Sequence, residues 1–118
     1  MSTKDVADGL MAMWNGGQWK ESGEKYWADD AVSCEPMEGP MARLQGREAL
    51  RGKAEWWDAN HDIHSFKADG LAINGDQFLV HFAMDVTNKA DGKRMQLSEH
   101  GLYTVKDGKI TEERFFMA

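Results

Sequence analysis

The stretch that decides the fold is DQFLVHFAMDVTNKADGKRMQLSEHGLYTVKDGKITEERFFM, residues 76–117. Apolar and polar side chains alternate over 77–87, and the alternation returns over 94–105. The side chains on the apolar face of the first run are Phe78, Val80, Phe82, Met84 and Val86. A period of two predicts strands with one buried face, and the Asp-Gly pairs between the runs favour tight hairpin turns. We therefore expect an antiparallel meander that ends with a strand over 109–117.

The residues before this stretch predict one more long strand, three helices and a short strand. Residues 62–73 read as the long strand, and apolar residues recur at helical spacing over 4–15, 18–28 and 46–59. Residues 31–35 read as a short strand that ends before a proline. Helices in the N-terminal half followed by a meander predict an α+β fold. The strands are long for a chain of this size, so the sheet is expected to curve around the helices.

Length and composition restrict the class of protein. The chain has 118 residues and a net charge of −6, which predicts a single domain over 1–118 and argues against nucleic-acid binding. Its longest apolar run, Leu10–Trp14, is too short to span a bilayer, and no signal peptide is recognisable at the start. The single cysteine, Cys34, excludes an internal disulfide and is expected to be a small core residue. We expect a cytoplasmic protein without membrane contact.

Glu99 is the candidate site residue that the pattern itself indicates. It lies in the apolar row of the strand at 94–105, whose other members are Leu97, Gly101, Tyr103 and Val105. A carboxylate in such a row is unfavourable unless it is paired or used in chemistry. Tyr103 is placed to donate a hydrogen bond to it. The alternative is a structural role, either a salt bridge, for example to Arg114 on the neighbouring strand, or a position near the open end of the fold, and the sequence does not choose between a functional and a structural role.

Two further carboxylates stand next to each other in the last strand. Glu112 and Glu113 are adjacent, so one of them faces inward if the strand is regular. Both have apolar companions on their own face, so alternation leaves the choice open.

The remaining polar residues predict no metal centre. His61 and His64 are three apart on a strand, so their imidazoles point to opposite faces. His64 shares a face with Phe66 under strict alternation, which makes it either a pocket residue or an ordinary core or surface histidine. Arg47 and Arg51, with Arg43 before them, are expected on a solvated helix face.

Three stretches resemble one family: YWADDAVSCEP (26–36), GREALRGKAEWW (46–57) and YTVKDGKITEERFF (103–116). They are similar to the SnoaL-like and ketosteroid-isomerase-like group of the nuclear-transport-factor-like superfamily, over nearly the whole chain. The resemblance implies a cystatin-like α+β barrel or cone, with three helices packed in a strongly curved mixed or antiparallel sheet. It also implies an apolar pocket for a small organic molecule and a homodimer formed through the outer sheet face, here with His81, His100 and Leu102.

The resemblance also assigns candidate roles. Glu35, just before a proline, aligns with the carboxylate that moves the proton in ketosteroid isomerase. Strict alternation would instead point Glu35 outward. The same alignment favours Glu113 over its neighbour. Leu10 and Gly101 stand where that isomerase has its two hydrogen-bond donors, so steroid isomerisation is not expected.

These residues lead to one preferred function and one alternative. We expect a cofactor-independent acid–base enzyme (an isomerase, cyclase or lyase) acting on an apolar, carbonyl-containing molecule, with Glu35 as base and Glu99 and Glu113 as partner groups. The pocket is expected to be lined by Trp14, Trp57, His64, Phe82, Tyr103 and Phe115. The alternative is a non-catalytic ligand-binding or dimerisation domain of the same fold.

Overall fold

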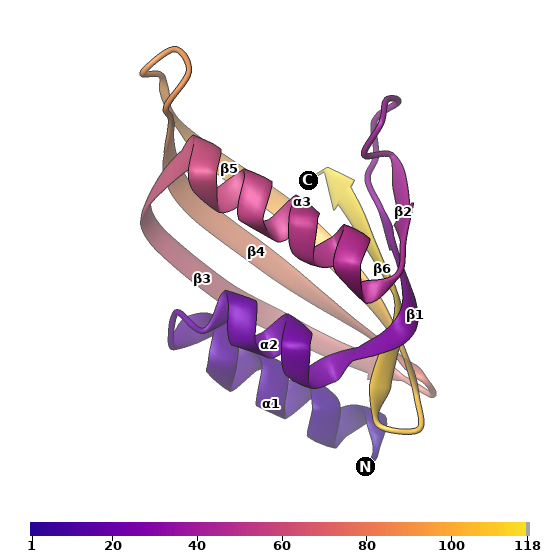
Figure 1. Cartoon of the computed structure of the whole chain (residues 1–118). Helices are drawn as coiled ribbons and strands as arrows, with labels where there is room; N and C mark the ends of the chain where they lie inside the picture. Colours follow the sequence, from indigo (N-terminus) through magenta and orange to yellow (C-terminus); the bar gives the residue numbers. More distant parts are fainter. Residues whose placement is uncertain (118) are drawn as a thin grey trace.

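Three helices lie on one side of a curved six-stranded sheet in the computed structural model, which describes residues 1–117 (Figure 1). The helices are α1 (Thr3–Asn15), α2 (Trp19–Tyr26) and α3 (Arg47–Asn60). The strands are β1 (Trp27–Cys34), β2 (Arg43–Gln45), β3 (His61–Asn74), β4 (Gln77–Asn88), β5 (Arg94–Lys106) and β6 (Lys109–Met117). None of these helices is long and apolar enough to cross a membrane.

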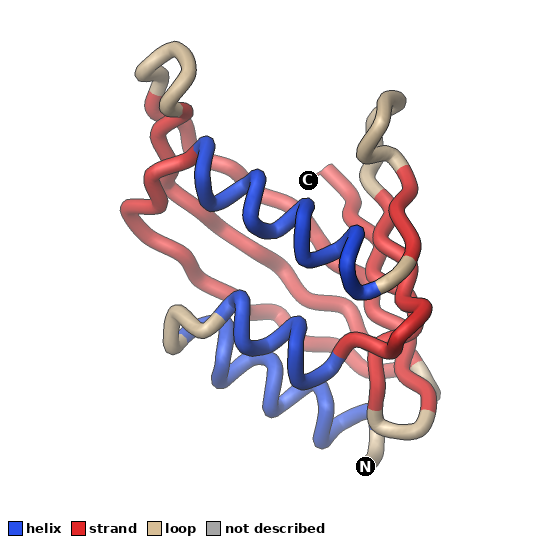
Figure 2. The backbone as a smooth tube through the Cα atoms, in the orientation of Figure 1, coloured by secondary structure: helices blue, strands red, loops and turns tan. Residues whose placement is uncertain are grey.

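The sheet is mixed and open. Its strand order is β2-β1-β6-β5-β4-β3, with β1 parallel to β6 and every other neighbouring pair antiparallel. Figure 2 shows the long strands curving behind the helices, with β2 and β3 left as the two edges. The predicted α+β cone is therefore confirmed, but the sheet does not close into a barrel.

The predicted elements differ from the observed ones mainly before residue 46. Strand β1 begins at Trp27, where the second helix was expected to continue, and the short strand β2 was not predicted. Both strands depend on distant partners, because β1 pairs with β6 and β2 pairs only with β1. A three-residue strand is too short to show an alternating pattern of apolar and polar residues. The sequence of β2 therefore gave no signal from which the strand could be predicted.

The core lies between α1 and the concave face of the sheet. Its members include Val6, Leu10, Phe78, Val80 and Ile110, all of which are buried. Helix α1 is fixed at its start by a capping box, in which the Ser2 side chain accepts from the Asp5 amide and the Asp5 side chain accepts from the Ser2 amide. A cap of this kind contributes about 1 kcal/mol to helix stability.

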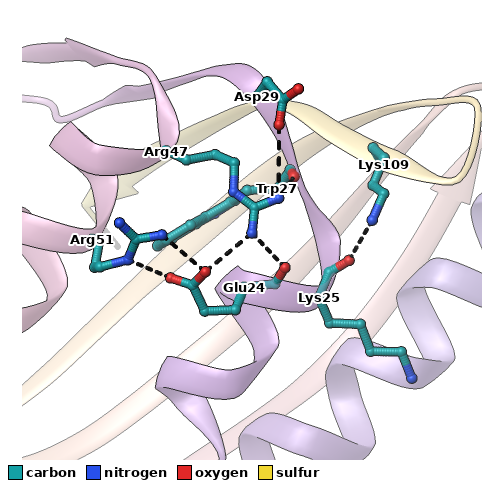
Figure 3. Close-up of polar contacts among 7 residues, drawn as sticks. All are labelled: Glu24, Lys25, Trp27, Asp29, Arg47, Arg51 and Lys109. Atoms are coloured by element: carbon teal, nitrogen blue, oxygen red, sulfur yellow. Dashed lines mark hydrogen bonds and ion pairs between the residues drawn. The ribbon is translucent and has the colours of Figure 1, made fainter.

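A cluster of one glutamate and two arginines joins α2 to α3 (Figure 3). Arg51 donates from Nε and Nη2 to the two Glu24 carboxylate oxygens, at 2.6 and 2.9 Å. Arg47 donates to the Glu24 carboxylate at 3.1 Å, to the Glu24 carbonyl at 2.6 Å and to the Trp27 carbonyl at 3.1 Å. Both arginines remain partly solvated, as expected, but the carboxylate that lies opposite them comes from another helix. Arg43 lies elsewhere, exposed on β2.

Replacing Glu24 with glutamine is expected to lower the melting temperature at pH 7. The hydrogen bonds from Arg51 and Arg47 lower the pKa of Glu24 from 4.5 to about 2. A carboxyl whose pKa is lowered by folding stabilises the protein above the unfolded pKa, and this stabilisation is lost as the pH falls through the folded pKa. The deficit of Glu24→Gln relative to wild type should therefore shrink between pH 4.5 and about 2 in thermal melts.

The matched control for this variant is Glu21→Gln, which changes an exposed glutamate of the same helix. It should melt with the wild type across the same pH range. Equal melting temperatures for the two variants at pH 7 would show that the cluster does not hold α3 in place.

The outer face of the sheet carries the histidines that were expected at a homodimer interface. His81 contacts Asp69 through Nδ1 at 3.1 Å and Ser98 through Nε2 at 2.6 Å. The rings of His81 and His100 lie 5.1 Å apart on neighbouring strands. These contacts lie within one chain, so the homodimer stays a prediction.

Candidate functional site

Two adjoining cavities lie among the aromatic residues of the concave face, each with a volume of about 140 Å³. We name them by their carboxylates. The Glu113 cavity is lined by Glu113 together with Leu10, Trp14, Trp19, Tyr26 and Tyr103, among others. The Glu99 cavity is the more open one and is lined by Glu99 with Trp14, Trp19, Phe66, Phe82, Tyr103 and Phe115. Trp14, Trp19 and Tyr103 belong to both, so these three side chains form the common boundary.

Glu113 is the inward-facing member of the glutamate pair on β6. Its side chain is buried, with 8% of the residue exposed. Trp27 Nε1 donates to Oε1 at 2.8 Å, and the Ser33 hydroxyl donates to Oε2 at 2.9 Å. Burial raises the pKa of Glu113 above its ordinary value, although the two hydrogen bonds oppose the shift. Glu112 faces the other way and pairs with Arg114 at 3.6 Å.

Glu99 lies in the wall of its cavity on β5, directly opposite Phe82 of β4. Burial is the main cause that raises its pKa from 4.5 to about 7, and the negative charge of Glu35 adds to the shift. The proposed salt bridge to Arg114 is not formed, since that arginine pairs with Glu112. Nor does any hydrogen bond join Glu99 to Tyr103 within residues 1–117. Glu99 therefore faces the cavity as a carboxyl that is partly protonated near neutral pH.

Glu35 lies just past the end of β1 in an ion pair with Lys53 of α3. The Lys53 Nζ is 2.6 Å from Glu35 Oε1, and it also donates to the Ser33 hydroxyl at 2.8 Å. The same Nζ lies 5.0 Å from the centre of the Phe115 ring. Lys53 therefore links two carboxylates: it pairs with Glu35 directly and reaches Glu113 through the Ser33 hydroxyl. It does so beside Phe115, whose ring lines the Glu99 cavity. Glu35 itself does not line either cavity.

The sequence places Lys53 on one side of the third helix but does not identify it as a site residue. Its partner Glu35 lies well before it in the chain, across a turn and β2, and no local spacing relates the two. One feature could have indicated a role for Lys53: it lies on the otherwise apolar side of the third helix, and this side is the one expected to face the sheet.

Tyr103 supplies a hydroxyl at the common boundary of the two cavities. Its ring is buried and stacks on Phe78, with ring centres 4.9 Å apart. Burial raises the pKa of Tyr103 well above 10, so the hydroxyl keeps its proton and remains a hydrogen-bond donor. Gly101, the preceding inward-facing residue of β5, makes room for this ring. A Cβ there would lie 2.8 Å from Tyr103 and 2.9 Å from Phe82.

The predicted aromatic lining is brought together only in part. Trp14, Phe82, Tyr103 and Phe115 all line the Glu99 cavity. Trp57 lines neither cavity, because it lies near the end of α3 and stacks on His61 at 3.7 Å between ring centres. Trp19 and Phe66, which the sequence did not assign to the pocket, line it with rings 5.3 Å apart.

His64 is exposed and lies apart from both cavities. It points to the outer face, where its Nε2 is 2.6 Å from the Thr87 hydroxyl. The face predicted for it is wrong, because the pairing of β3 with β4 shifts between Ile63 and Ser65. A β-bulge of this kind adds one residue to a strand and reverses the alternation that follows.

Comparison with known proteins places this arrangement in one family. The family model described as "SnoaL-like domain" matches residues 1–117. A crystal structure from Mesorhizobium loti, of a protein described as a candidate SnoaL-like polyketide cyclase and also as a carbohydrate phosphatase, is 49% identical, with a TM-score of 0.95, over 98% of this chain and 99% of that one. A search of the curated proteins finds no match to the chain.

More distant structures share the fold alone. A protein of unknown function with a cystatin-like fold from Xanthomonas campestris has 19% identity and a TM-score of 0.80, over 100% of this chain and 92% of that one. A protein with a ketosteroid isomerase-like fold from Catenulispora acidiphila has 18% identity and a TM-score of 0.76, over 96% and 85%. With the family match covering residues 1–117, the chain belongs to the SnoaL-like domain family.

Proposed function

We propose that the chain is a cofactor-independent acid–base enzyme that acts on a carbonyl-containing, largely apolar molecule in the Glu99 cavity. The observation that carries the proposal is Glu99 itself, a carboxyl in a wall of aromatic rings with a pKa of about 7. A general base works best when its pKa lies near the working pH, and burial is a common way to achieve this for a glutamate. A structural carboxylate would instead be paired, as Glu24 and Glu112 are.

The proposed step needs only residues of this chain. The Glu99 carboxylate removes a proton from the carbon next to the substrate carbonyl. The electron pair of that C–H bond forms the C=C bond of an enolate, and the π pair of the carbonyl moves to its oxygen. Tyr103 donates a hydrogen bond to the enolate oxygen, which stabilises the negative charge that develops there. For an isomerisation, Glu99 then returns the proton to another carbon. For a ring closure, the enolate carbon instead attacks a second carbonyl carbon, and Glu99 gives the proton to the alkoxide oxygen that forms there.

Tyr103 can supply the hydrogen-bond donor that is missing at the two positions where ketosteroid isomerase has its donors. Leu10 and Gly101 cannot donate hydrogen bonds from their side chains, and the structure has Leu10 in the wall of the Glu113 cavity as a plain apolar residue. The Tyr103 side chain lines both cavities and keeps its proton. In this proposal Glu113 is a second acid, and the Glu35–Lys53 ion pair sets the local charge. The ring-closing form of the proposed step agrees with the polyketide cyclase part of the description of the Mesorhizobium loti protein.

The test is turnover of small β,γ-unsaturated ketones, followed by the absorbance of the conjugated product. Wild type should isomerise at least one of them, with a rate that rises with pH through about 7 as Glu99 ionises. Glu99→Gln should reduce the rate by about 100-fold or more, the usual contribution of a general base. Glu112→Gln is the matched control and should leave it unchanged, because Glu112 faces away from the cavity.

Two outcomes would contradict the proposal. One is turnover by Glu99→Gln at the wild-type rate. The other is binding of these ketones by wild type without any turnover, which would favour the non-catalytic ligand-binding domain instead.

A further inference from the structure

The Glu113 cavity combines one carboxylate with a wall made mostly of aromatic rings. Besides Glu113 and a few small or aliphatic residues, its lining consists of five aromatic side chains: Trp14, Trp19, Tyr26, Trp27 and Tyr103. No lysine, arginine or histidine of residues 1–117 belongs to this lining. The negative charge of Glu113 therefore has no protein cation beside it on the side of the cavity.

The hydrogen bonds around Glu113 have a fixed direction, which favours its ionised form. The Trp27 indole N–H can only donate, and it donates to Glu113 Oε1 at 2.8 Å. The Lys53 ammonium can only donate as well, so the Ser33 oxygen accepts from it at 2.8 Å. Ser33 then uses its single hydroxyl proton for Glu113 Oε2, at 2.9 Å. Both carboxylate oxygens thus accept a hydrogen bond from the protein and keep a further lone pair for a ligand.

The rings beside Glu113 are held in place by the protein itself. Gly23 makes room for the Trp27 ring, because a Cβ at this position would lie 2.7 Å from it. Gly9 of α1 does the same for Tyr26, since a Cβ there would clash with the Tyr26 hydroxyl. A ligand therefore meets rings that are already ordered, and its binding costs little side-chain entropy.

A small organic cation is the ligand chemistry that uses both the rings and the carboxylate. A methylated ammonium is attracted to the faces of tryptophan and tyrosine rings, and it would also offset the burial that raises the pKa of Glu113. An engineered apolar cavity of about 150 Å³ binds benzene, so this cavity of about 140 Å³ has room for the smaller trimethylammonium group. A metal ion would instead need several oxygen ligands, and Glu113 is the only carboxylate in the lining.

We propose that the Glu113 cavity binds a methylated ammonium group, with Glu113 as its counter-ion and the surrounding rings as the wall that contacts its methyl groups. This inference goes beyond the proposed function, whose base Glu99 lies in the adjoining cavity. An occupied site holds Glu113 ionised, so Glu113 serves as the second acid only while the site is empty.

The experiment compares choline with 3,3-dimethylbutan-1-ol, in which a carbon atom replaces the charged nitrogen. The two molecules share their shape and their hydroxyl, so a difference in affinity reports the charge. Binding is followed by the indole N–H signal of Trp27 in ¹⁵N-labelled protein, because this group donates to Glu113. Wild type at pH 8 should bind choline more tightly by about tenfold or more. A purely apolar cavity would prefer the uncharged alcohol, which loses less hydration on binding.

Glu113→Gln should abolish the preference for choline, because the amide carries no charge. The matched control is Glu112→Gln, which removes the neighbouring charge on the same strand, where the side chain faces the other way and pairs with Arg114. This control should keep the preference. Equal binding of the two ligands by wild type, survival of the preference in Glu113→Gln, or its loss in both variants would each overturn the inference.

A second measurement applies even if Glu113→Gln does not fold. In Glu99→Gln, which lacks the neighbouring carboxyl with a pKa of about 7, the preference for choline should fall between pH 8 and pH 4 as Glu113 takes up its proton. Of the other titratable groups around Glu113, Lys53 and Glu35 are paired with each other and Tyr103 keeps its proton. A preference that stays constant over this range would contradict the inference. Neither readout involves turnover, so failure here leaves the proposed function of Glu99 as it stands.

Discussion

Glu99→Gln is expected to raise the free energy of unfolding by about 2–3 kcal/mol at pH 8 and to change it little at pH 4. The pKa of Glu99 rises from 4.5 to about 7 on folding, mainly because the carboxyl is buried. The folded protein therefore binds the proton more tightly than the unfolded chain. Stability from this group is fully present below pH 4.5 and is lost as the pH rises through about 7. A glutamine does not ionise, so the variant avoids that loss.

The measurement is urea denaturation of both proteins at pH 4 and pH 8. Glu112→Gln, on the next strand but facing outward, is the control and should show no comparable gain at pH 8. A stabilising substitution that also abolishes turnover is the signature of a residue kept for function. Identical stability of Glu99→Gln and wild type at pH 8 would show that Glu99 is solvated and would remove the main support for the proposed function.

Lys53→Met is expected to lower the free energy of unfolding by about 3 kcal/mol, the largest loss expected from any single polar substitution here. The side chains of Lys53 and Glu35 are only 17% and 19% exposed, and they form an ion pair at 2.6 Å. Removing the ammonium leaves the Glu35 carboxylate partly buried with no partner among the described residues. It also removes the donor to Ser33, whose hydroxyl holds Glu113.

The double variant Lys53→Met/Glu35→Gln separates the two effects. It removes the unpaired charge and should recover most of the stability lost in Lys53→Met, as measured by urea denaturation at pH 7. Lys20→Met, which changes a lysine that is 69% exposed, should cost little. A double variant no more stable than Lys53→Met would mean that the pair does not interact as described.

The period of two in β4 and β5 was enough to predict most of the concave face. It placed Phe82, Glu99 and Tyr103 on the buried side, and the register of the two strands agrees. The prediction succeeded there because these strands are long and regular, so one buried face imposes its pattern on many residues. It failed at His64, where one bulge reverses the alternation.

The site residues that were missed are those whose partners lie far away in the chain. Lys53 meets Glu35 across β2, and Arg51 meets Glu24 across β1. Trp19 belongs to a short helix, and the apolar pattern of that helix does not predict that the Trp19 side chain lines a cavity. Long charged and aromatic side chains have the same local spacing on a solvated face as in a site, so the sequence does not distinguish the two.

The sequence by itself determined the α+β class, the curved meander and the unusual position of Glu99, because these follow from a local period and from the unfavourable burial of a lone carboxylate. Only the tertiary structure decided that Glu113 rather than Glu112 faces inward, with Trp27 and Ser33 donating to it. It also decided that Glu35 pairs with Lys53 instead of lining a cavity. The physical reason is that charge pairing and cavity shape depend on which elements meet across the cone, and strand order and register set those meetings.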